Sequence, residues 1–170
     1  MAVVVRPEED GDRDGIRAVH LASFVSSEEA DLVDALRESG DYMQSLSSVA
    51  LDDGAVIGHV GFSRARLEGA DVDILVLAPL AVLPPHQRQG VGPGLIGSSI
   101  ERAEGTDFPV VVVLGHRAYY PRFGFEPAGA IGIDPPFETH ADAWMARRLR
   151  AWSPRVRGTV RFAAPFDALL

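Results

Sequence analysis

The residues with the clearest chemical potential lie in one short stretch, Gln87 to Gly94, which reads Gln-Arg-Gln-Gly-Val-Gly-Pro-Gly. The glycines, Gly90, Gly92 and Gly94, remove side chains, so backbone N–H groups can closely approach a bound group. A helical pattern follows, and the start of a helix offers unpaired N–H donors and about half a positive charge. Arg88 adds a full positive charge. This combination predicts a binding site for a pyrophosphate.

Two other interpretations of the glycines are open. They could form only a tight turn that binds nothing. Gly92, Gly94 and Gly97 also spell Gly-x-Gly-x-x-Gly, the fingerprint of dinucleotide-binding folds. That fingerprint needs a strand that ends almost at its first glycine, and an acid at the end of the next strand. Residues 84–89 separate the expected strand from Gly92, and the next strand ends in Gly-His-Arg at 115–117, so the dinucleotide interpretation is disfavoured.

Composition narrows the class of protein. The 170 residues suit one domain, and 46% hydrophobic with 24% charged residues is typical of a globular chain. Sixteen basic and 24 acidic residues give a net charge of −8, which argues against nucleic acid as a partner. The absence of cysteine and lysine excludes thiolate metal ligands, a cysteine nucleophile and a Schiff base. No metal is expected.

The sequence predicts neither a secretory signal nor a membrane partner. The opening residues combine a short apolar run with several acids. The longest apolar run, Ile74 to Pro85, is shorter than the roughly 18 residues of a membrane span. A cytoplasmic location is therefore expected, and a homodimer is compatible with the sequence.

Hydrophobic periodicity predicts mixed strands and helices around one core. The expected strands cover residues 2–6, 47–51, 55–67, 73–83, 110–114 and 158–163, with another beginning at Phe125, and the expected helices cover 10–24, 28–39, 91–103 and 117–122. Turns are expected at 52–54 and 68–71. Ser26 and Ser27 suit a helix N-cap, and Pro79 predicts a bulge because proline cannot donate to a strand ladder. The elements do not alternate strictly, which favours an α+β domain with a largely antiparallel sheet.

A family resemblance rests on two motifs. Gln87-Arg88-Gln89-Gly90-Val91-Gly92 resembles the acyl-CoA signature of the GNAT superfamily of N-acyltransferases, (Q/R)-x-x-G-x-(G/A). The segment from Tyr120 to Phe125 resembles the family's Tyr-x-x-x-Gly-Phe, and its surroundings are similar to a bacterial branch of predicted N-acetyltransferases. The resemblance implies a single domain over residues 1–170 with a C-terminal extension from about residue 131. Its sheet would be mixed, largely antiparallel, splayed at the cofactor site and flanked by helices.

The resemblance also implies acetyl-CoA as the acyl donor. The residues implied to hold the pyrophosphate, chiefly through backbone N–H groups, are Gln87, Arg88, Gln89, Gly90, Val91, Gly92 and Gly94. The strand residues Leu80, Ala81 and Val82 would pair their backbone with the pantetheine arm. The Leu80 N–H is the candidate donor to the thioester carbonyl oxygen, since a donor at such an oxygen is typically worth about a hundredfold in rate.

Catalytic roles follow from the same resemblance. Tyr120 would be the general acid, because a phenol with a pKa near 10 is still protonated at pH 7 and can donate to a departing thiolate. The alternative is an aromatic side chain that packs under the sheet, and Tyr119 is the fallback acid. For the base, His116 ranks above three carboxylates that fit surface or capping roles, namely Asp73, Glu28 and Glu29. His59 is expected to be a hydrogen-bonded packing residue.

The chain departs from the resemblance in one respect. Many members place an asparagine after the strand equivalent to residues 110–114, whereas this chain contains none and has Gly115-His116 there. Further along, Phe137, Trp144 and Met145 fit either an acceptor pocket or the core. The arginine-rich residues 147–161 suit a solvated face or contact with the adenosine 3′-phosphate.

The leading hypothesis is an N-acetyltransferase that transfers acetyl from acetyl-CoA to a primary amine by direct attack in a ternary complex. The acceptor would be a small-molecule amine or an amine of a protein or peptide, and the negative net charge favours a cationic one. The alternative is a non-catalytic acyl-CoA binding or sensing module, which would keep the glycine loop and the strand but would not need Tyr120.

Overall fold

A computed structural model describes residues 2–169 and contains one sheet flanked by helices. Within those residues the sheet has nine strands. Seven run in the order β1-β2-β3-β4-β5-β8-β6, and β9 pairs with β3 and β7 beside this path. The strands are β1 (Val3–Pro7), β2 (Ser48–Asp52), β3 (Ala55–Glu68), β4 (Val72–Val82), β5 (Val110–Leu114), β6 (Glu126–Pro127), β7 (Ile133–Asp134), β8 (Trp144–Arg148) and β9 (Gly158–Arg161). Only β4–β5 and β7–β9 pair in parallel, which confirms the largely antiparallel sheet.

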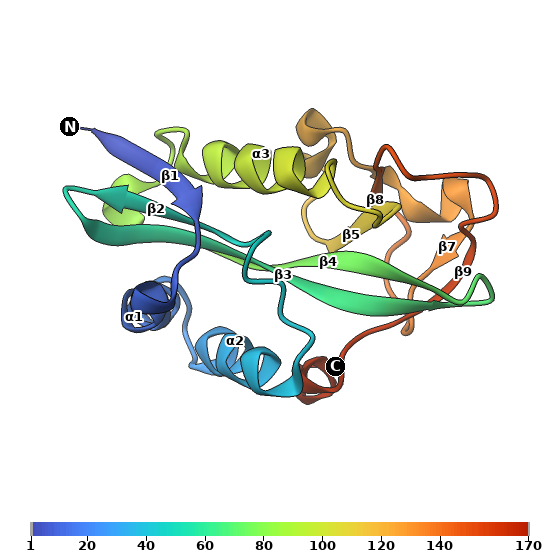
Figure 1. The fold of residues 1–170 in the computed structure, drawn as a ribbon, viewed down its shortest axis with the longest axis horizontal. Helices are drawn as coiled ribbons and strands as arrows, with labels where there is room; N and C mark the ends of the chain where they lie inside the picture. Colours follow the sequence, from blue (N-terminus) through green and yellow to red (C-terminus); the bar gives the residue numbers. More distant parts are fainter. Residues whose placement is uncertain (1, 170) are drawn as a thin grey trace.

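Three helices cover the two faces of this sheet (Figure 1). They are α1 (Arg13–Ser23), α2 (Glu28–Ser39) and α3 (Val91–Ala103). Helix α3 lies on one face, and α1 and α2 lie on the other. No helix in the described part of the chain is both long and apolar enough to cross a membrane.

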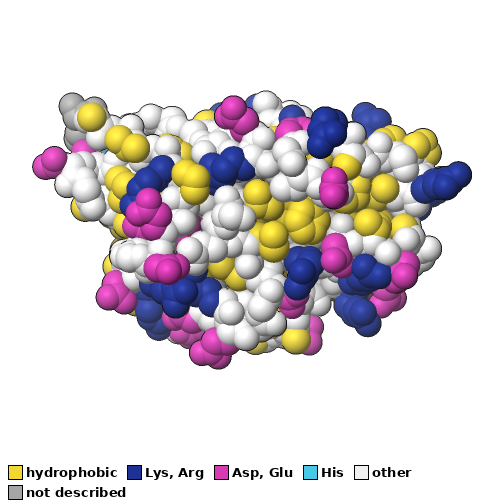
Figure 2. All heavy atoms as spheres, viewed as in Figure 1, with side chains coloured by type: hydrophobic (Ala, Val, Ile, Leu, Met, Phe, Trp, Pro, Cys, Tyr) yellow, Lys and Arg dark blue, Asp and Glu magenta, His cyan; other side chains and the backbone are white. Residues whose placement is uncertain are grey.

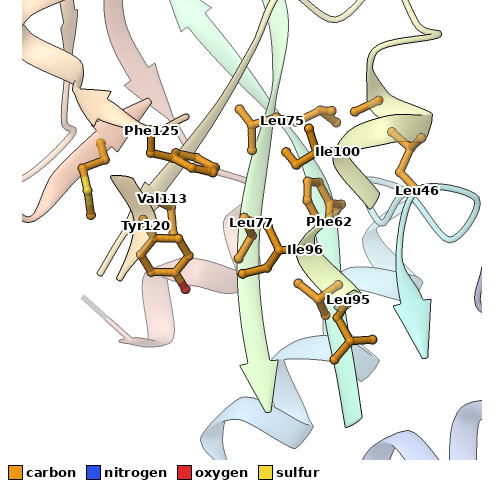
Figure 3. Packing of buried hydrophobic residues seen from close by; sticks show 14 of the residues in the cluster. Leu46, Phe62, Leu75, Leu77, Leu95, Ile96, Ile100, Val113, Tyr120 and Phe125 are labelled. Carbon is orange, nitrogen blue, oxygen red and sulfur yellow. The ribbon is translucent and has the colours of Figure 1, made fainter. Parts of the chain in front are cut away.

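The sheet side chains alternate between two apolar layers, as strand geometry requires. On the α3 side, Leu75 and Leu77 pack with Leu95 and Ile96 (Figure 3). On the opposite side, Ile74, the next residue along β4, belongs to the cluster that includes α2. The core is therefore divided by the sheet, and α3 packs against β1, β2, β3 and β4, which all precede it in the chain.

Several sequence predictions needed correction at the ends of elements. The first helix begins at Arg13, after a separate 3-10 turn at Asp10–Asp12. The expected helix at 117–122 is a turn followed by a 3-10 segment, Tyr120–Phe123, because Pro121 lacks the N–H that a longer helix needs. The strand expected from Phe125 is only Glu126–Pro127. Ser27 occupies the N-cap of α2, but its hydroxyl donates to Asp31 instead of capping the backbone.

A buried polar network joins α1 and α2 to the sheet. His59, on β3, is fully buried and contacts His20 of α1 at 2.8 Å and Glu8 at 3.1 Å. Glu8 is 4% exposed and also accepts hydrogen bonds from Arg37 of α2, at 2.5 Å, and from Tyr42. The sequence prediction that His59 is a hydrogen-bonded packing residue agrees with these contacts, although its partners were not anticipated.

The charge states of this network fix its proton positions. Burial raises the pKa of Glu8, but hydrogen bonds from His59, Arg37 and Tyr42 more than offset this and leave the pKa below its ordinary value. An ionised Glu8 can only accept, so the His59 Nε2 carries a proton. Burial lowers the pKa of His59 and keeps it neutral, so its Nδ1 must accept from the His20 Nε2–H. The network is thus a directed chain of donors that ends on Glu8.

This network predicts a specific loss of stability in acid. Burial, and then the neighbouring His59, lower the pKa of His20 to about 3, whereas an unfolded histidine titrates near pH 6.5. Below pH 6.5 the unfolded chain therefore binds a proton that the folded chain does not. His20 alone should reduce the free energy of unfolding by about 1.4 kcal/mol for each pH unit, and its contribution is fully present above pH 6.5.

Urea unfolding between pH 7 and pH 5 measures this effect. His20→Gln should flatten the pH dependence by about one proton, while the exposed control His140→Gln should leave it as in the wild type. An unchanged slope in His20→Gln would contradict the assignment of a neutral, buried His20.

Candidate functional site

The site begins with an irregularity in β4. Val60 pairs with Leu80 and Phe62 pairs with Leu77, so Ala78 and Pro79 together face Gly61. The Ala78–Pro79 peptide bond is cis. A Cβ atom on Gly61 would lie 3.0 Å from the Ala78 oxygen and 3.3 Å from the Pro79 Cδ, so only glycine fits opposite the two residues without displacement. The bulge predicted at Pro79 is confirmed.

Beyond the bulge, one edge of β4 has no strand beside it. Strand β5 pairs with β4 only at Leu75 and Val76. On the other edge, the Leu83 N–H donates to the Ile57 carbonyl at 2.8 Å. Because antiparallel residues alternate, Leu80 points its N–H and C=O away from β3, toward the space where β5 has diverged. The sheet is therefore splayed at this point, as the resemblance implied.

The same alternation distinguishes the three strand residues singled out from the sequence. Ala81 directs its backbone groups at His59 of β3, so they are already paired. Val82 faces the splayed edge, but its carbonyl accepts a hydrogen bond from the Gln87 Nε2 at 2.9 Å. Of these three residues, Leu80 therefore has both its N–H and its C=O directed into the space between β4 and β5. Gln87 thus ties the glycine loop to the end of β4.

The loop between β4 and α3 presents a row of donors. Within the described residues, the backbone N–H groups of residues 88–92 donate to no protein acceptor. Gly90 has a φ of 82° and forms the N-cap of α3, a conformation that glycine adopts without strain. Gly94 differs from the sequence expectation, because its N–H already donates to the Gly90 carbonyl at 3.1 Å as the first bond of the helix. Arg88 is exposed and forms no ion pair with any described residue.

Two adjoining cavities lie along this edge. One has a volume of about 640 Å³ and is lined by Leu80, Val82, the loop from His86, Tyr119 and Arg122. The second, of about 410 Å³, shares Leu80 and Tyr119 with the first and continues to Tyr120 and His116. The two cavities form a groove from the loop donors to Tyr120, and the side chains of the loop do not fill it.

Tyr120 is 7% exposed and lies beside Phe125, with ring centres 5.6 Å apart. Figure 3 shows its oxygen pointing away from Phe125, on the side of β4. A Cβ atom on Gly115 would lie 2.4 Å from the Tyr120 ring, so the glycine that stands in place of the family's asparagine makes room for this ring. Burial, with a smaller effect of Tyr119, raises the pKa of Tyr120 to about 12, and the phenol therefore stays protonated.

Tyr119 occupies a different position. Its hydroxyl oxygen lies 2.7 Å from where a Cβ of Gly92 would be, so the ring crosses over the start of α3. The Arg122 guanidinium lies 4.5 Å from the centre of the Tyr119 ring. Burial raises the pKa of Tyr119, with Arg122 opposing it. Tyr119 thus lies at the junction of the two cavities, between the loop and Tyr120.

The base candidates separate clearly in space. His116 lines the second cavity together with Tyr120. Asp73 instead accepts a hydrogen bond from Arg66 at 3.0 Å and lines a separate cavity with Asp41. Glu28 and Glu29 line neither part of the groove. Among the described residues, no group of three or more histidines or carboxylates is arranged to hold a metal ion.

Of the three C-terminal candidates for an acceptor pocket, Trp144 and Met145 belong to the core, whereas Phe137 is half-buried. Trp144 and Met145 are 2% and 1% exposed within β8, and the Trp144 indole donates to the Ile133 carbonyl at 3.0 Å. Phe137 lies beside Trp144. Arg147 is not on a solvated face, because it donates to the Phe123 carbonyl and to Glu104.

Several cavity residues were not singled out from the sequence, among them Phe24 and Leu114. Phe24, which directly follows α1, and Leu114, the last residue of β5, both line the second cavity. Leu114 is the one exposed member of an otherwise buried apolar strand, and Phe24 follows the apolar stripe of α1. The sequence does not show that the end of α1 and the end of β5 meet, so it could not assign either residue to the cavity.

The comparisons with known proteins agree with this arrangement. The model of the acetyltransferase (GNAT) family matches residues 13–125. The uncharacterised N-acetyltransferase YjhQ of Escherichia coli K12 is 41% identical over 160 residues, which cover 91% of this chain and 88% of that protein. YhbS of the same strain, another uncharacterised N-acetyltransferase, is 40% identical over 127 residues, or 74% of this chain and 75% of the relative.

Two solved structures have the same fold. The crystal structure of Escherichia coli YhbS with CoA superposes with a TM-score of 0.89 at 33% identity, and the match covers 97% of this chain and 92% of that one. A GNAT family acetyltransferase from Brucella melitensis, in complex with acetyl-CoA, superposes with a TM-score of 0.80 at 30% identity, covering 98% and 99% of the two chains.

The contact between Gly115 and Tyr120 predicts the effect of one methyl group. Gly115→Ala should push the ring out of its buried position, so that a phenol pKa moves from about 12 toward 10. Absorbance at alkaline pH measures this change. Gly97→Ala, which meets no atom within 4 Å, is the matched control and should titrate as the wild type does. Identical titrations for both variants would show that Gly115 does not set the position of Tyr120.

Proposed function

Because the chain belongs to the GNAT family of acetyltransferases, we propose that it transfers an acetyl group to a primary amine by direct attack within a ternary complex. Acetyl-CoA, when bound, supplies the activated acetyl group as a thioester. The observation that carries the proposal is the continuous groove from the unpaired loop donors to Tyr120. The remaining argument concerns what the residues of this chain do along that groove.

The residues fit a CoA molecule in two respects. The N–H groups of residues 88–92, the positive end of α3 and the charge of Arg88 would hold the pyrophosphate. The Leu80 N–H and C=O point into the splay and would pair with an amide of the pantetheine arm. Val82 would contribute its N–H only, because Gln87 occupies its carbonyl. Ala81 supports the strand through its pairing with β3 and does not reach the ligand by its backbone.

Tyr120 would act as the general acid. Its phenol is protonated at neutral pH and lies in the same cavity as Leu80, where a departing sulfur would need a proton. The Leu80 N–H would donate a hydrogen bond to the acyl oxygen as negative charge develops on it.

His116 would accept the proton that the attacking nitrogen loses. It lines the cavity that contains Tyr120, and imidazole is the side chain best suited to take a proton near neutral pH. The phenols of Tyr119 and Tyr120 are unsuited to this role because both have raised pKa values.

A non-catalytic acyl-CoA sensor is the alternative function. It would need the loop and the splayed strand but neither Tyr120 nor His116. The shared cavity of those two residues favours the enzyme. Release of free thiol from acetyl-CoA in the presence of a broad panel of amines separates the two functions, since a sensor would bind acetyl-CoA without releasing thiol.

Replacing Tyr120 tests the acid. Tyr120→Phe should lower kcat by about a hundredfold, because general acid catalysis is worth at least that much, while the dissociation constant for CoA stays within a few-fold. Tyr119→Phe is the matched control for an adjacent phenol, and its kcat should stay close to that of the wild type. A large loss of kcat in Tyr119→Phe, with Tyr120→Phe unaffected, would reverse the assignment.

Replacing Gly92 tests the pyrophosphate site. Gly92→Val would place its Cβ 2.7 Å from the Tyr119 hydroxyl and cover neighbouring N–H groups, so CoA should bind at least tenfold more weakly. Gly97→Ala, in the same helix but facing open space, should bind CoA normally. Calorimetry with CoA measures both, and equal affinities would place the pyrophosphate elsewhere.

A further inference from the structure

The cavity beside Tyr120 has walls that are mostly apolar. Phe24, Pro79, Val113 and Leu114 supply much of its surface, and its titratable side chains are His116 and the two tyrosines. Among the residues that the structure describes, no aspartate or glutamate lines it. The part of the groove that would receive an acceptor therefore lacks the carboxylate that an ammonium group would need.

Exposed apolar side chains are found at this cavity and in the part of the chain next to Phe24. Leu114 lines the cavity and is 47% exposed, although it ends a buried strand. Leu21 is 46% exposed, and Val25 is fully exposed immediately after the cavity residue Phe24. Leu114 is thus a large aliphatic side chain that lines the cavity and is not buried in the core, which is typical of a surface that binds an apolar ligand.

Two of the acidic side chains are already paired with arginines and do not line this cavity. Asp142 is paired with Arg117, the residue that follows His116 in the chain. Asp73 is paired with Arg66 in a different cavity. On the face shown in Figure 2, acidic and basic side chains are interspersed and form no single patch of one sign. Neither Asp142 nor Asp73 therefore supplies a free carboxylate next to Tyr120.

We propose that the acceptor is a primary amine carried on an apolar, uncharged alkyl or aryl body, and not a polyamine or a lysine-rich peptide. This inference rests on the proposed function and specifies its substrate class. Burying a second ammonium group in this cavity would cost its hydration without a compensating ion pair. The apolar walls also favour the uncharged form of the reacting nitrogen, the form that can attack.

In the reaction of such an acceptor, His116 and Tyr120 would account for the two proton transfers. A carbon–nitrogen bond forms as the carbon–sulfur bond of the thioester breaks. His116 takes one proton from the nitrogen, and Tyr120 gives its proton to the sulfur. Solvent then returns the proton from His116 to Tyr120, and the net products are the N-acetylamine and CoA thiol. No oxidant, reductant or metal is involved in this balance.

Pentylamine and 1,5-diaminopentane make the sharpest comparison, because they have the same five-carbon chain and differ only in the second ammonium group. The wild type should acetylate pentylamine with a kcat/KM at least tenfold higher. In the series propylamine, pentylamine, heptylamine, kcat/KM should rise by up to about fourfold for each added methylene until the cavity is filled. Equal or better use of 1,5-diaminopentane would overturn the inference.

A binding measurement separates this inference from the proposed function. Calorimetry of each amine with the CoA-bound protein needs no reaction, and pentylamine should bind more tightly than 1,5-diaminopentane. If no amine releases thiol from acetyl-CoA, the proposed function fails, and the binding series decides the inference alone. If the two amines bind equally, the inference is wrong whatever the activity.

Leu114→Asp supplies the missing carboxylate and tests the wall directly. This variant should lower kcat/KM for pentylamine and raise it for 1,5-diaminopentane, so that the ratio between the two falls by at least tenfold. Val4→Asp is the matched control, since Val4 is a 53% exposed aliphatic side chain on β1 outside the groove. Its ratio should equal that of the wild type. An unchanged ratio in Leu114→Asp would show that Leu114 does not face the acceptor.

Discussion

The site depends on one edge of β4, where backbone N–H and C=O groups have no strand partner in the described structure. Backbone N–H and C=O groups in a sheet need partners, and β4 loses its partner on one side where β5 diverges beyond Val76. The bulge of Ala78 and Pro79 opposite Gly61 sets the orientation of Leu80 at that point. Leu80 therefore presents its backbone groups to a cavity instead of to another strand. The glycine loop, α3 and Tyr120 are arranged around this edge.

A second constraint is electrostatic and local. The chain is strongly acidic, yet the groove has a positive end built from backbone dipoles and arginines. Arg88 and Arg122 both line the larger cavity, and neither pairs with a described carboxylate. The opposite end of the groove is apolar and contains Tyr120. A ligand with an anionic head and an acyl end would thus be oriented in one direction along the groove.

Local sequence patterns predicted the parts of the fold that depend on local chemistry. The glycine loop and the bulge at Pro79 follow from backbone conformations that few residues allow, and the helix over residues 91–103 follows from its hydrophobic pattern. The structure has all three. The Tyr-x-x-x-Gly-Phe motif led to Tyr120, although not to its packing on Gly115, which requires the backbone to be in place. Phe24 and Leu114 line the site because the end of α1 and the end of β5 meet in space. Hydrophobic periodicity does not predict which ends of elements meet.

The network around His59 could not be predicted for a related reason. Glu8, His20, Arg37, Tyr42 and His59 come from separate elements and have no common spacing in the sequence. A single buried histidine in a strand indicates only that some partner exists. Likewise, β8 was missed because Arg147 looks like a surface residue, whereas its guanidinium is held by Glu104 and the Phe123 carbonyl. A charged residue that the sequence alone assigns to solvent can thus be held inside the fold by an ion pair with a residue far away in the chain.

Amide hydrogen exchange measured by NMR, with and without CoA, tests the role of the splayed edge most directly. The account predicts that the Leu80 amide exchanges quickly in the unliganded protein and becomes protected when CoA binds. The neighbouring Ala81 amide, which is paired with β3, should be protected in both states and is an internal control. A Leu80 amide that is already protected without CoA, or that stays unprotected with it, would contradict the claim that this edge of β4 holds the ligand.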